Sequence, residues 1–271
     1  MPSNPLFLTT AIEAVVLAGD QQMARFGQPF AVNKKGTIDL VTEVDVEVER
    51  RFRALIEQRF PAHQILAEEM GGARAVPAGP CWIFDPIDGT TNFAHGLPIF
   101  CASLALEIDG VAEVAAVYDP NRKELFTAER GGGAFLNGRP LHVSSAGRLV
   151  DAMLVTGFPY DVHTRVEEIV GLFGAFVGRA RAVRRLGSAA IDLCYVAAGR
   201  LDGFWETDLK PWDIAGGALI AAEAGGRVTD TDGAPFRSRS GHVLATNGHL
   251  HEAMLDVIRE HRAGRARNVT H

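Results

Sequence analysis

The segment from Trp82 to Phe93, which reads WIFDPIDGTTNF, constrains the fold more than any other part of the chain. Its apolar first half predicts a buried strand with Asp85 at its end, because Pro86 removes a donor from the ladder and stops the strand. Asp88 is then a suitable N-cap for a helix that opens at Gly89. The two carboxylates converge beside backbone amides at the helix start. These amides attract an anion, whereas the carboxylates repel it, and a divalent metal ion between the carboxylates removes that repulsion. Carboxylate oxygens favour Mg²⁺.

Two further acids follow a predicted strand over 64–67, where the sequence reads ILAEEM. Adjacent residues of a strand face opposite sides, so we expect at most one of Glu68 and Glu69 to join the acidic cluster directly. We assign Glu68 to the cluster. Glu69 then either orients a neighbouring ligand or is a solvated charge.

Asp45 and Asp213 lie near the starts of two predicted helices. Thr42 and Asp45 have the spacing of a capping box, which explains Asp45 without a metal, although capping and metal binding are compatible. Pro211 suits the first helical position and places Asp213 in the first turn, where the helix dipole favours negative charge. Trp212 and the small residues that follow indicate that this helix end is buried, and a buried carboxylate needs a cation or a donor.

Hydrophobic periodicity predicts a layered α/β protein in two halves. Apolar residues recur at helical spacing over 8–26 and 44–60, and short runs between 64 and 127, separated by Asp-Gly and Gly-Gly-Gly turns, indicate an antiparallel meander. After Ser144 strands alternate with helices: strands over 152–156, 180–184 and 201–205, helices over 164–177, 188–198 and 211–224. We place a soft boundary near residue 150, which gives an α+β half over 1–150 and an α/β half over 151–271 that share one interface. We expect the polar tail over 263–271 to be disordered.

Charge and composition exclude several classes of function. Acidic residues outnumber basic ones by 33 to 27, and the net charge of −6 disfavours a general binder of nucleic acid or of a membrane surface. The three cysteines lie far apart in apolar runs, so we expect buried, reduced thiols rather than a zinc site or disulfides. No apolar run reaches the roughly 18 residues of a membrane span, and the first residues lack a signal-peptide pattern. We therefore expect a cytoplasmic protein.

Taken together, these segments resemble the inositol monophosphatase family. The family signature is similar to 85–93 here, joined to the upstream Glu68-Glu69 pair and the downstream Trp212-Asp213 pair. The resemblance also takes in 35–45, 156–159, 185–190 and 198–203, so it covers nearly the whole chain. Met70 departs from the small polar residue that often follows the glutamates, but it leaves the ligand set intact. The resemblance implies a layered α/β/α/β/α sandwich, commonly a homodimer, that hydrolyses small phosphate monoesters with Mg²⁺.

Carried over residue by residue, the resemblance implies a ligand set for Mg²⁺ made of Glu68, Asp85, the Ile87 carbonyl, Asp88 and Asp213. Thr90 and Glu68 then position the attacking water, and Asp45 is an outer participant. The amides of Gly89 and Thr90 bind the phosphate, and the other substrate-binding residues are Gly187, Ser188 and Glu206. The expected reaction is an in-line displacement by activated water, without a covalent phosphoenzyme.

Glu206 bears on the identity of the substrate. In the family it matches a residue that accepts hydrogen bonds from substrate hydroxyls, which favours a polyol phosphate and in particular inositol 1-phosphate. The same carboxylate could instead pair with an amine, as in the histidinol-phosphate phosphatases. Other relatives act on fructose 1,6-bisphosphate, nucleotide bisphosphates or NADP, so a different sugar or nucleotide phosphatase is a further alternative.

Two hypotheses belong to other classes of function. Some bacterial members that resemble this chain also associate with RNA-processing or transcription machinery, although the acidic balance gives a regulatory binding role little support. A dinucleotide-binding oxidoreductase has only the triplet Gly131-Gly132-Gly133 in its favour. That triplet lies in a predicted hairpin rather than between a strand and a helix, so the dinucleotide fingerprint fails.

Overall fold

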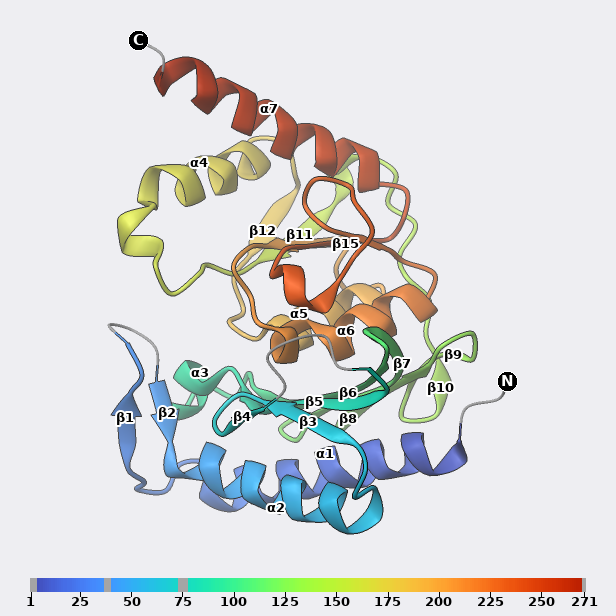
Figure 1. The fold of residues 1–271 in the computed structure, drawn as a ribbon. Helices are drawn as coiled ribbons and strands as arrows, with labels where there is room; N and C mark the ends of the chain where they lie inside the picture. The colour runs from blue at the N-terminus through green and yellow to red at the C-terminus, as the bar shows by residue number, and fades with distance from the viewer. Residues whose placement is uncertain (1–3, 37–39, 73–77, 270–271) are drawn as a thin grey trace.

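The chain folds into five stacked layers (Figure 1). A computed structural model describes residues 4–36, 40–72 and 78–269. From one face to the other, the layers are a helix pair, a large sheet, a second helix pair, a smaller sheet and a third helix pair. The three pairs are α1 (Pro5–Arg25) with α2 (Glu43–Arg59), α5 (Ala189–Ala197) with α6 (Pro211–Glu223), and α4 (Val166–Val177) with α7 (His251–Val269). This arrangement confirms the predicted α/β/α/β/α sandwich.

The larger sheet contains eight strands in the order β10-β9-β8-β7-β6-β5-β3-β4. The strands from β5 to β10 pair antiparallel in sequence order, as the predicted meander requires. The strand β3 departs from that pattern, because it pairs in parallel with β5. The bounds are β3 (Gln64–Ala67), β4 (Gly71–Gly72), β5 (Pro80–Asp88), β6 (Cys101–Ile108), β7 (Val111–Asp119), β8 (Glu124–Glu129), β9 (Gly133–Leu136) and β10 (Arg139–Pro140).

The smaller sheet has the order β12-β11-β13-β15-β14 and is mixed. Its strands are β11 (Met153–Thr156), β12 (Ala182–Arg184), β13 (Gly203–Glu206), β14 (Arg227–Thr229) and β15 (Val243–Thr246). A separate hairpin pairs β1 (Val32–Lys34) with β2 (Leu40–Thr42), and the short helices are α3 (Thr90–Ala94), η1 (Leu149–Asp151), η2 (Val162–Thr164) and η3 (Ser238–Ser240).

The C-terminal segment is a helix where disorder was expected. α7 extends to Val269, so the expectation for 263–271 was wrong over 263–269. The buried residues Met254, Leu255 and Ile258 anchor this helix on the smaller sheet, and the helix then continues beyond its anchored part. None of the described helices combines the length and the apolar character that a membrane span needs. All three cysteines are buried and free, as expected.

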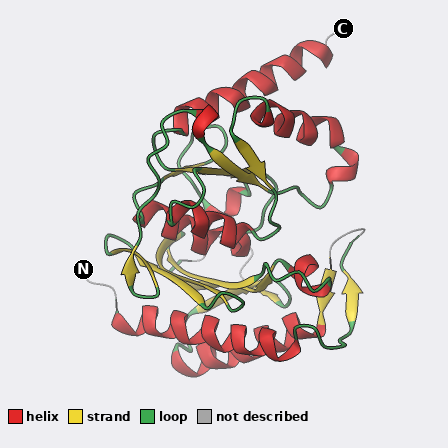
Figure 2. Cartoon of the chain, turned by 180° about the vertical axis from the view of Figure 1, so that it is seen from behind, coloured by secondary structure: helices red, strands yellow, loops and turns green. Residues whose placement is uncertain are grey.

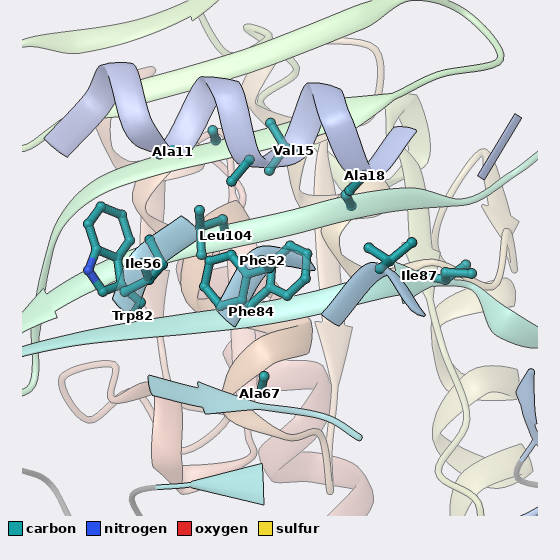
Figure 3. Close-up of a cluster of buried hydrophobic side chains, with 14 of the residues drawn as sticks. Ala11, Val15, Ala18, Phe52, Ile56, Ala67, Trp82, Phe84, Ile87 and Leu104 are labelled. Atoms are coloured by element: carbon teal, nitrogen blue, oxygen red, sulfur yellow. The ribbon is translucent and has the colours of Figure 1, made fainter. Parts of the chain in front are cut away.

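Two of the hydrophobic clusters pack the large sheet against the helix pairs on its two faces. In the first, small residues of α1 such as Ala11 and Val15 lie close to the large sheet, while Phe52 of α2 stacks on Phe84 of β5 at 4.1 Å between ring centroids (Figure 3). The second draws buried residues from β6, β7, β8 and β9 of the large sheet and from α5 and α6. Figure 2 shows from behind that this helix pair lies between the two sheets. The two halves therefore share a continuous apolar interface through α5 and α6.

The strand β5 runs three residues further than predicted. It ends at Asp88 rather than at Asp85, so the expected stop at Pro86 was wrong. The pairing with β6 shifts register between Asp85 and Asp88. An irregularity of this kind tolerates a proline, because the ladder is already interrupted where the proline lacks its donor.

Candidate active site

A cavity of about 340 Å³ opens where the two halves of the chain meet. It is lined from the first half by the end of β5 and the start of α3, and from the second half by the ends of β13, α5 and α6. The lining includes the predicted site residues Asp88, Gly89, Thr90, Gly187, Ser188, Glu206 and Asp213. The packing of the halves therefore brings residues more than 100 positions apart to one cavity.

Asp88 is held by the second half of the chain. Its Oδ2 accepts a hydrogen bond of 2.6 Å from Ser188 Oγ and one of 2.7 Å from the Ala190 amide. The predicted role of Asp88 as an N-cap was wrong, because Gly89 caps α3 with a left-handed φ of 101° and no side-chain bond. The continuation of β5 to Asp88 shifts the start of the helix by one residue and directs this carboxylate toward α5.

The backbones of the two halves approach closely beside Asp88. A Cβ on Gly89 would lie 2.9 Å from the Ile99 carbonyl oxygen and 3.2 Å from that of Gly187, so this left-handed position requires glycine. Asn92 Nδ2 donates to the Ile99 carbonyl at 2.8 Å and to the Leu186 carbonyl at 2.9 Å. One amide group thus ties the loop after α3 to the loop before α5.

Asp45 and Thr90 are in contact inside the first half. The predicted capping box is present, since Thr42 N donates to Asp45 Oδ2 at 2.8 Å and Thr42 Oγ1 accepts from the Asp45 amide. Thr90 Oγ1 lies 3.3 Å from Asp45 Oδ1 and 2.9 Å from the Ile87 carbonyl oxygen. A hydroxyl carries one proton, so it donates to one of these oxygens at a time. Burial raises the pKa of Asp45 to about 6. Asp39, in the segment 35–45 that carries the family resemblance, lies outside the described residues.

Glu68 and Glu69 contact the same cation. Lys35 Nζ donates to Glu68 Oε1 at 2.8 Å and to Glu69 Oε1 at 2.6 Å. β3 ends at Ala67, so the alternation of strand side chains that separated the two glutamates does not extend to them. Burial raises the pKa of Glu68 to about 8 and that of Glu69 to about 7, while Lys35 opposes both shifts. The role of Lys35 was missed, although it lies in a segment that carries the family resemblance.

Asp85 and Asp213 belong to the same electrostatic group as Glu68 and Asp88. Burial raises the pKa of Asp85 well above its ordinary range, and the charges of Glu68, Asp88 and Asp213 add to the shift. Burial likewise raises the pKa of Asp213, and the charges of Asp88 and Glu68 raise it further. Each Asp is oriented through one oxygen, since Asp85 Oδ1 accepts from the Ile87 amide at 2.9 Å and Asp213 Oδ2 from the Lys210 amide at 2.6 Å.

A set of mutually repelling, oxygen-bearing acids suits a hard divalent cation. Buried carboxylates need a compensating charge, and a small cation bound by oxygen would supply it. Within the described ranges, no three His, Cys, Asp or Glu side chains already form a closed ligand set. The ligand set implied by the resemblance therefore stays a prediction.

Glu206 and Gly157 fit against each other at the far side of the cavity. Glu206 ends β13 and is buried, and a Cβ on Gly157 would lie 2.0 Å from its Oε2. Any side chain at 157 would displace this carboxylate. Burial raises the pKa of Glu206 to about 8, and Arg185 opposes the shift. Asp192 of α5 lines the same cavity and was missed, although a lone acid in the apolar run AAIDLCYVA was a signal.

Comparisons with known proteins agree with one another. The model of the inositol monophosphatase family matches residues 5–263. An inositol-1-monophosphatase of Synechocystis sp. is 44% identical, over 93% of this chain and 88% of that protein. The Nus factor SuhB of Pseudomonas aeruginosa is also 44% identical, over 85% of this chain and 87% of its own. The solved inositol monophosphatase of Anabaena (Nostoc) sp. superposes with a TM-score of 0.86 at 39% identity, covering 94% of this chain and 96% of its own.

The fold and these relatives define a phosphoric monoester hydrolase. The chain belongs to the inositol monophosphatase family and is a phosphatase of that family.

Proposed function

We propose that this phosphatase hydrolyses the phosphate monoester of a polyol, with inositol 1-phosphate as the favoured substrate. The observation that carries the proposal is the position of Glu206, a buried carboxylate that faces the same cavity as Asp88 and Asp213. A carboxylate there accepts hydrogen bonds from hydroxyl groups of the leaving alcohol. Gly157 supports this role, because a side chain at that position would occupy the space that the Glu206 carboxylate fills.

We further propose that Mg²⁺ is the cofactor. The residues that would hold it are the carboxylates of Glu68, Asp85, Asp88 and Asp213 with the carbonyl of Ile87. When bound, a divalent ion lowers the pKa of water and stabilises the charge that develops on a leaving oxygen. The burial and mutual repulsion of these carboxylates support the proposal.

The remaining groups of the cavity have roles that follow from their contacts. Thr90 and Glu68 position the attacking water, and Asp45 is an outer participant whose Oδ1 lies 3.3 Å from the hydroxyl of Thr90. The amides of Gly89 and Thr90 bind the phosphate. Gly187 and Ser188 complete the substrate side, and Ser188 acts through its hydrogen bond to Asp88. No covalent intermediate on the chain is required.

A phosphate-release screen tests this proposal. Purified protein is assayed with and without Mg²⁺ on inositol 1-phosphate, histidinol phosphate, fructose 1,6-bisphosphate and a nucleotide bisphosphate. We expect Mg²⁺-dependent release with the highest kcat/KM on inositol 1-phosphate. A higher kcat/KM on histidinol phosphate would move the assignment to that alternative, and a preference for either bisphosphate would exclude a polyol monoester.

A regulatory role is a second proposal, favoured by the relatives named Nus factor SuhB at 42–44% identity. The net charge of −6 gives no support to a general attraction for nucleic acid. Binding of RNA by the metal-free protein, weakened by salt, would support the role. The expectations of a homodimer and of a cytoplasmic location come from the resemblance and from the sequence, and light scattering after gel filtration tests the first of them.

A further inference from the structure

Asp192 is a buried acid that the roles above do not use. It lies in the first turn of α5, is 1% exposed, and lines the cavity that also contains Glu206. Its Oδ1 is fully enclosed and has no hydrogen-bond partner among the described residues. A buried carboxyl oxygen without a donor is rare in folded proteins and points to a group that the cavity receives.

The surrounding protein does not compensate this carboxyl group. The first-turn amides of α5 are engaged elsewhere, since Ala190 N donates to Asp88 and Ile191 N to Ser188. The helix dipole stabilises a charge in the first turn far less than burial of an ionised carboxylate costs. The nearby cation Arg185 is exposed, and its guanidinium lies over the ring of Phe158 at 5.6 Å from the centroid. Arg185 acts on Asp192 through its charge alone, since Asp192 Oδ1 has no hydrogen-bond partner among the described residues.

We infer that Asp192 is a second acidic residue of the leaving-group site, where Asp192 and Glu206 accept hydrogen bonds from two hydroxyls of a polyol. The inference rests on the proposed function and deepens it, because two acceptors in one cavity select an alcohol with several hydroxyl donors. Arg185 lines the same cavity. Its positive charge disfavours a cationic amine and leaves neutral hydroxyls as the donors that fit.

The variant Asp192→Asn tests the inference with little change of shape. Asparagine keeps the side-chain volume but loses the charge that strengthens a bond to a hydroxyl. We expect kcat/KM on inositol 1-phosphate to fall about tenfold or more. The loss of kcat/KM on 4-nitrophenyl phosphate, which has no such hydroxyls, should be at least tenfold smaller. The Mg²⁺ concentration for half-maximal activity should stay within twofold of wild type, which separates Asp192 from the metal ligands.

Asp119→Asn is the matched control, because Asp119 is equally buried but is the last residue of β7, where it pairs with Arg122. The melting temperature of both variants is measured, so that loss of folded protein is not counted as loss of activity. The control should lower stability without changing the ratio of kcat/KM between the two substrates. The same ratio change in both variants would overturn the inference.

Further outcomes would also overturn it. Equal losses on both substrates, or no loss on either, would show that Asp192 does not contact the leaving group. If Asp192→Asn/Glu206→Gln loses no more than Glu206→Gln alone, Asp192 only positions Glu206. A loss confined to histidinol phosphate would assign the pair to an amine. If the wild-type protein releases no phosphate from inositol 1-phosphate, it is the proposed function that fails, which the wild type alone reveals.

Discussion

Ser188 Oγ donates a hydrogen bond of 2.6 Å to Asp88 Oδ2 across 100 positions of sequence. The same hydroxyl caps α5, where it accepts from the Ile191 amide at 3.4 Å. One side chain therefore fixes both the start of a helix in the second half and the orientation of a carboxylate from the first half. Where such a carboxylate binds a metal ion, mutation of the group that orients it typically costs about 10–100-fold in metal affinity or activity.

Ser188→Ala should weaken Mg²⁺ activation and destabilise the fold modestly. Loss of the donor lets the Asp88 carboxylate rotate, so we expect the Mg²⁺ concentration for half-maximal activity to rise about tenfold. Loss of the N-cap should lower the free energy of unfolding by about 1 kcal/mol. Ser188→Thr keeps a hydroxyl and should recover most of the activation. An unchanged Mg²⁺ requirement in Ser188→Ala would show that Asp88 needs no orientation.

Asp88→Asn should abolish turnover without unfolding the chain. The amide oxygen of asparagine can still accept from Ser188 and Ala190, so the contact between the halves persists, but the charged ligand is lost. Circular dichroism and melting temperature report the fold, and phosphate release reports activity. Near-normal turnover at saturating Mg²⁺ would contradict the assignment of Asp88 as a ligand.

Ca²⁺ should inhibit the Mg²⁺-supported reaction. It binds the same carboxylate oxygens but prefers longer bonds and more ligands, which loosens the geometry that aligns water with phosphorus. The measurement is phosphate release at fixed Mg²⁺ with increasing Ca²⁺. Turnover with Ca²⁺ alone that equals turnover with Mg²⁺ would show that no tight cluster forms.

Glu206→Gln should lower activity on a polyol phosphate and leave activity on a generic phosphate ester nearly unchanged. Above the pKa of about 8 that burial gives Glu206, the carboxylate is ionised and the change weakens charge-assisted hydrogen bonds worth about 1.5–3 kcal/mol. About tenfold or more of kcat/KM on inositol 1-phosphate should then be lost. Hydrolysis of 4-nitrophenyl phosphate should be nearly unaffected, because it lacks the hydroxyls. Equal loss on both would place Glu206 among the groups that support the fold or the metal.

His251 should make stability fall in mild acid. Its imidazole is fully buried between Thr229 Oγ1 at 2.9 Å and Thr246 Oγ1 at 3.0 Å, and burial together with Arg227 lowers its pKa to about 4. The unfolded chain therefore binds this proton first, and stability present above pH 6.5 is lost as the pH falls toward 4.

We expect this histidine to contribute on the order of 2 kcal/mol to the loss of unfolding free energy between pH 7 and pH 4. Urea unfolding of His251→Gln should show a smaller loss over that interval than the wild type. His249→Gln, at an exposed position two residues away, should behave like the wild type. Identical pH dependence in all three proteins would contradict the role of His251.

Local patterns in the sequence were sufficient for most of the fold. The helical spacing and the Thr42–Asp45 capping box depend on residues a few positions apart, and both appear in the structure as predicted. The strand of four residues at β15 and the strand of three at β14 were missed. The equally short strands β3 and β11 were predicted, so length alone does not account for the two that were missed. α7 was missed although its buried residues Met254, Leu255 and Ile258 recur at helical spacing.

The sequence by itself determined most of the helices and strands, and that acids follow several of them. Only the tertiary structure decided that Asp88 turns to Ser188 instead of capping α3, and that Glu68 and Glu69 share Lys35. It also decided that Asp192 Oδ1 is enclosed with no hydrogen-bond partner among the described residues. The contact of Asp88 with Ser188 joins the two halves where the large sheet packs on α5 and α6, and the contacts of Lys35 join positions 33 and 34 apart within the first half. Propensities and caps act over a few residues, whereas the environment of a buried carboxylate is set by whatever distant elements enclose it.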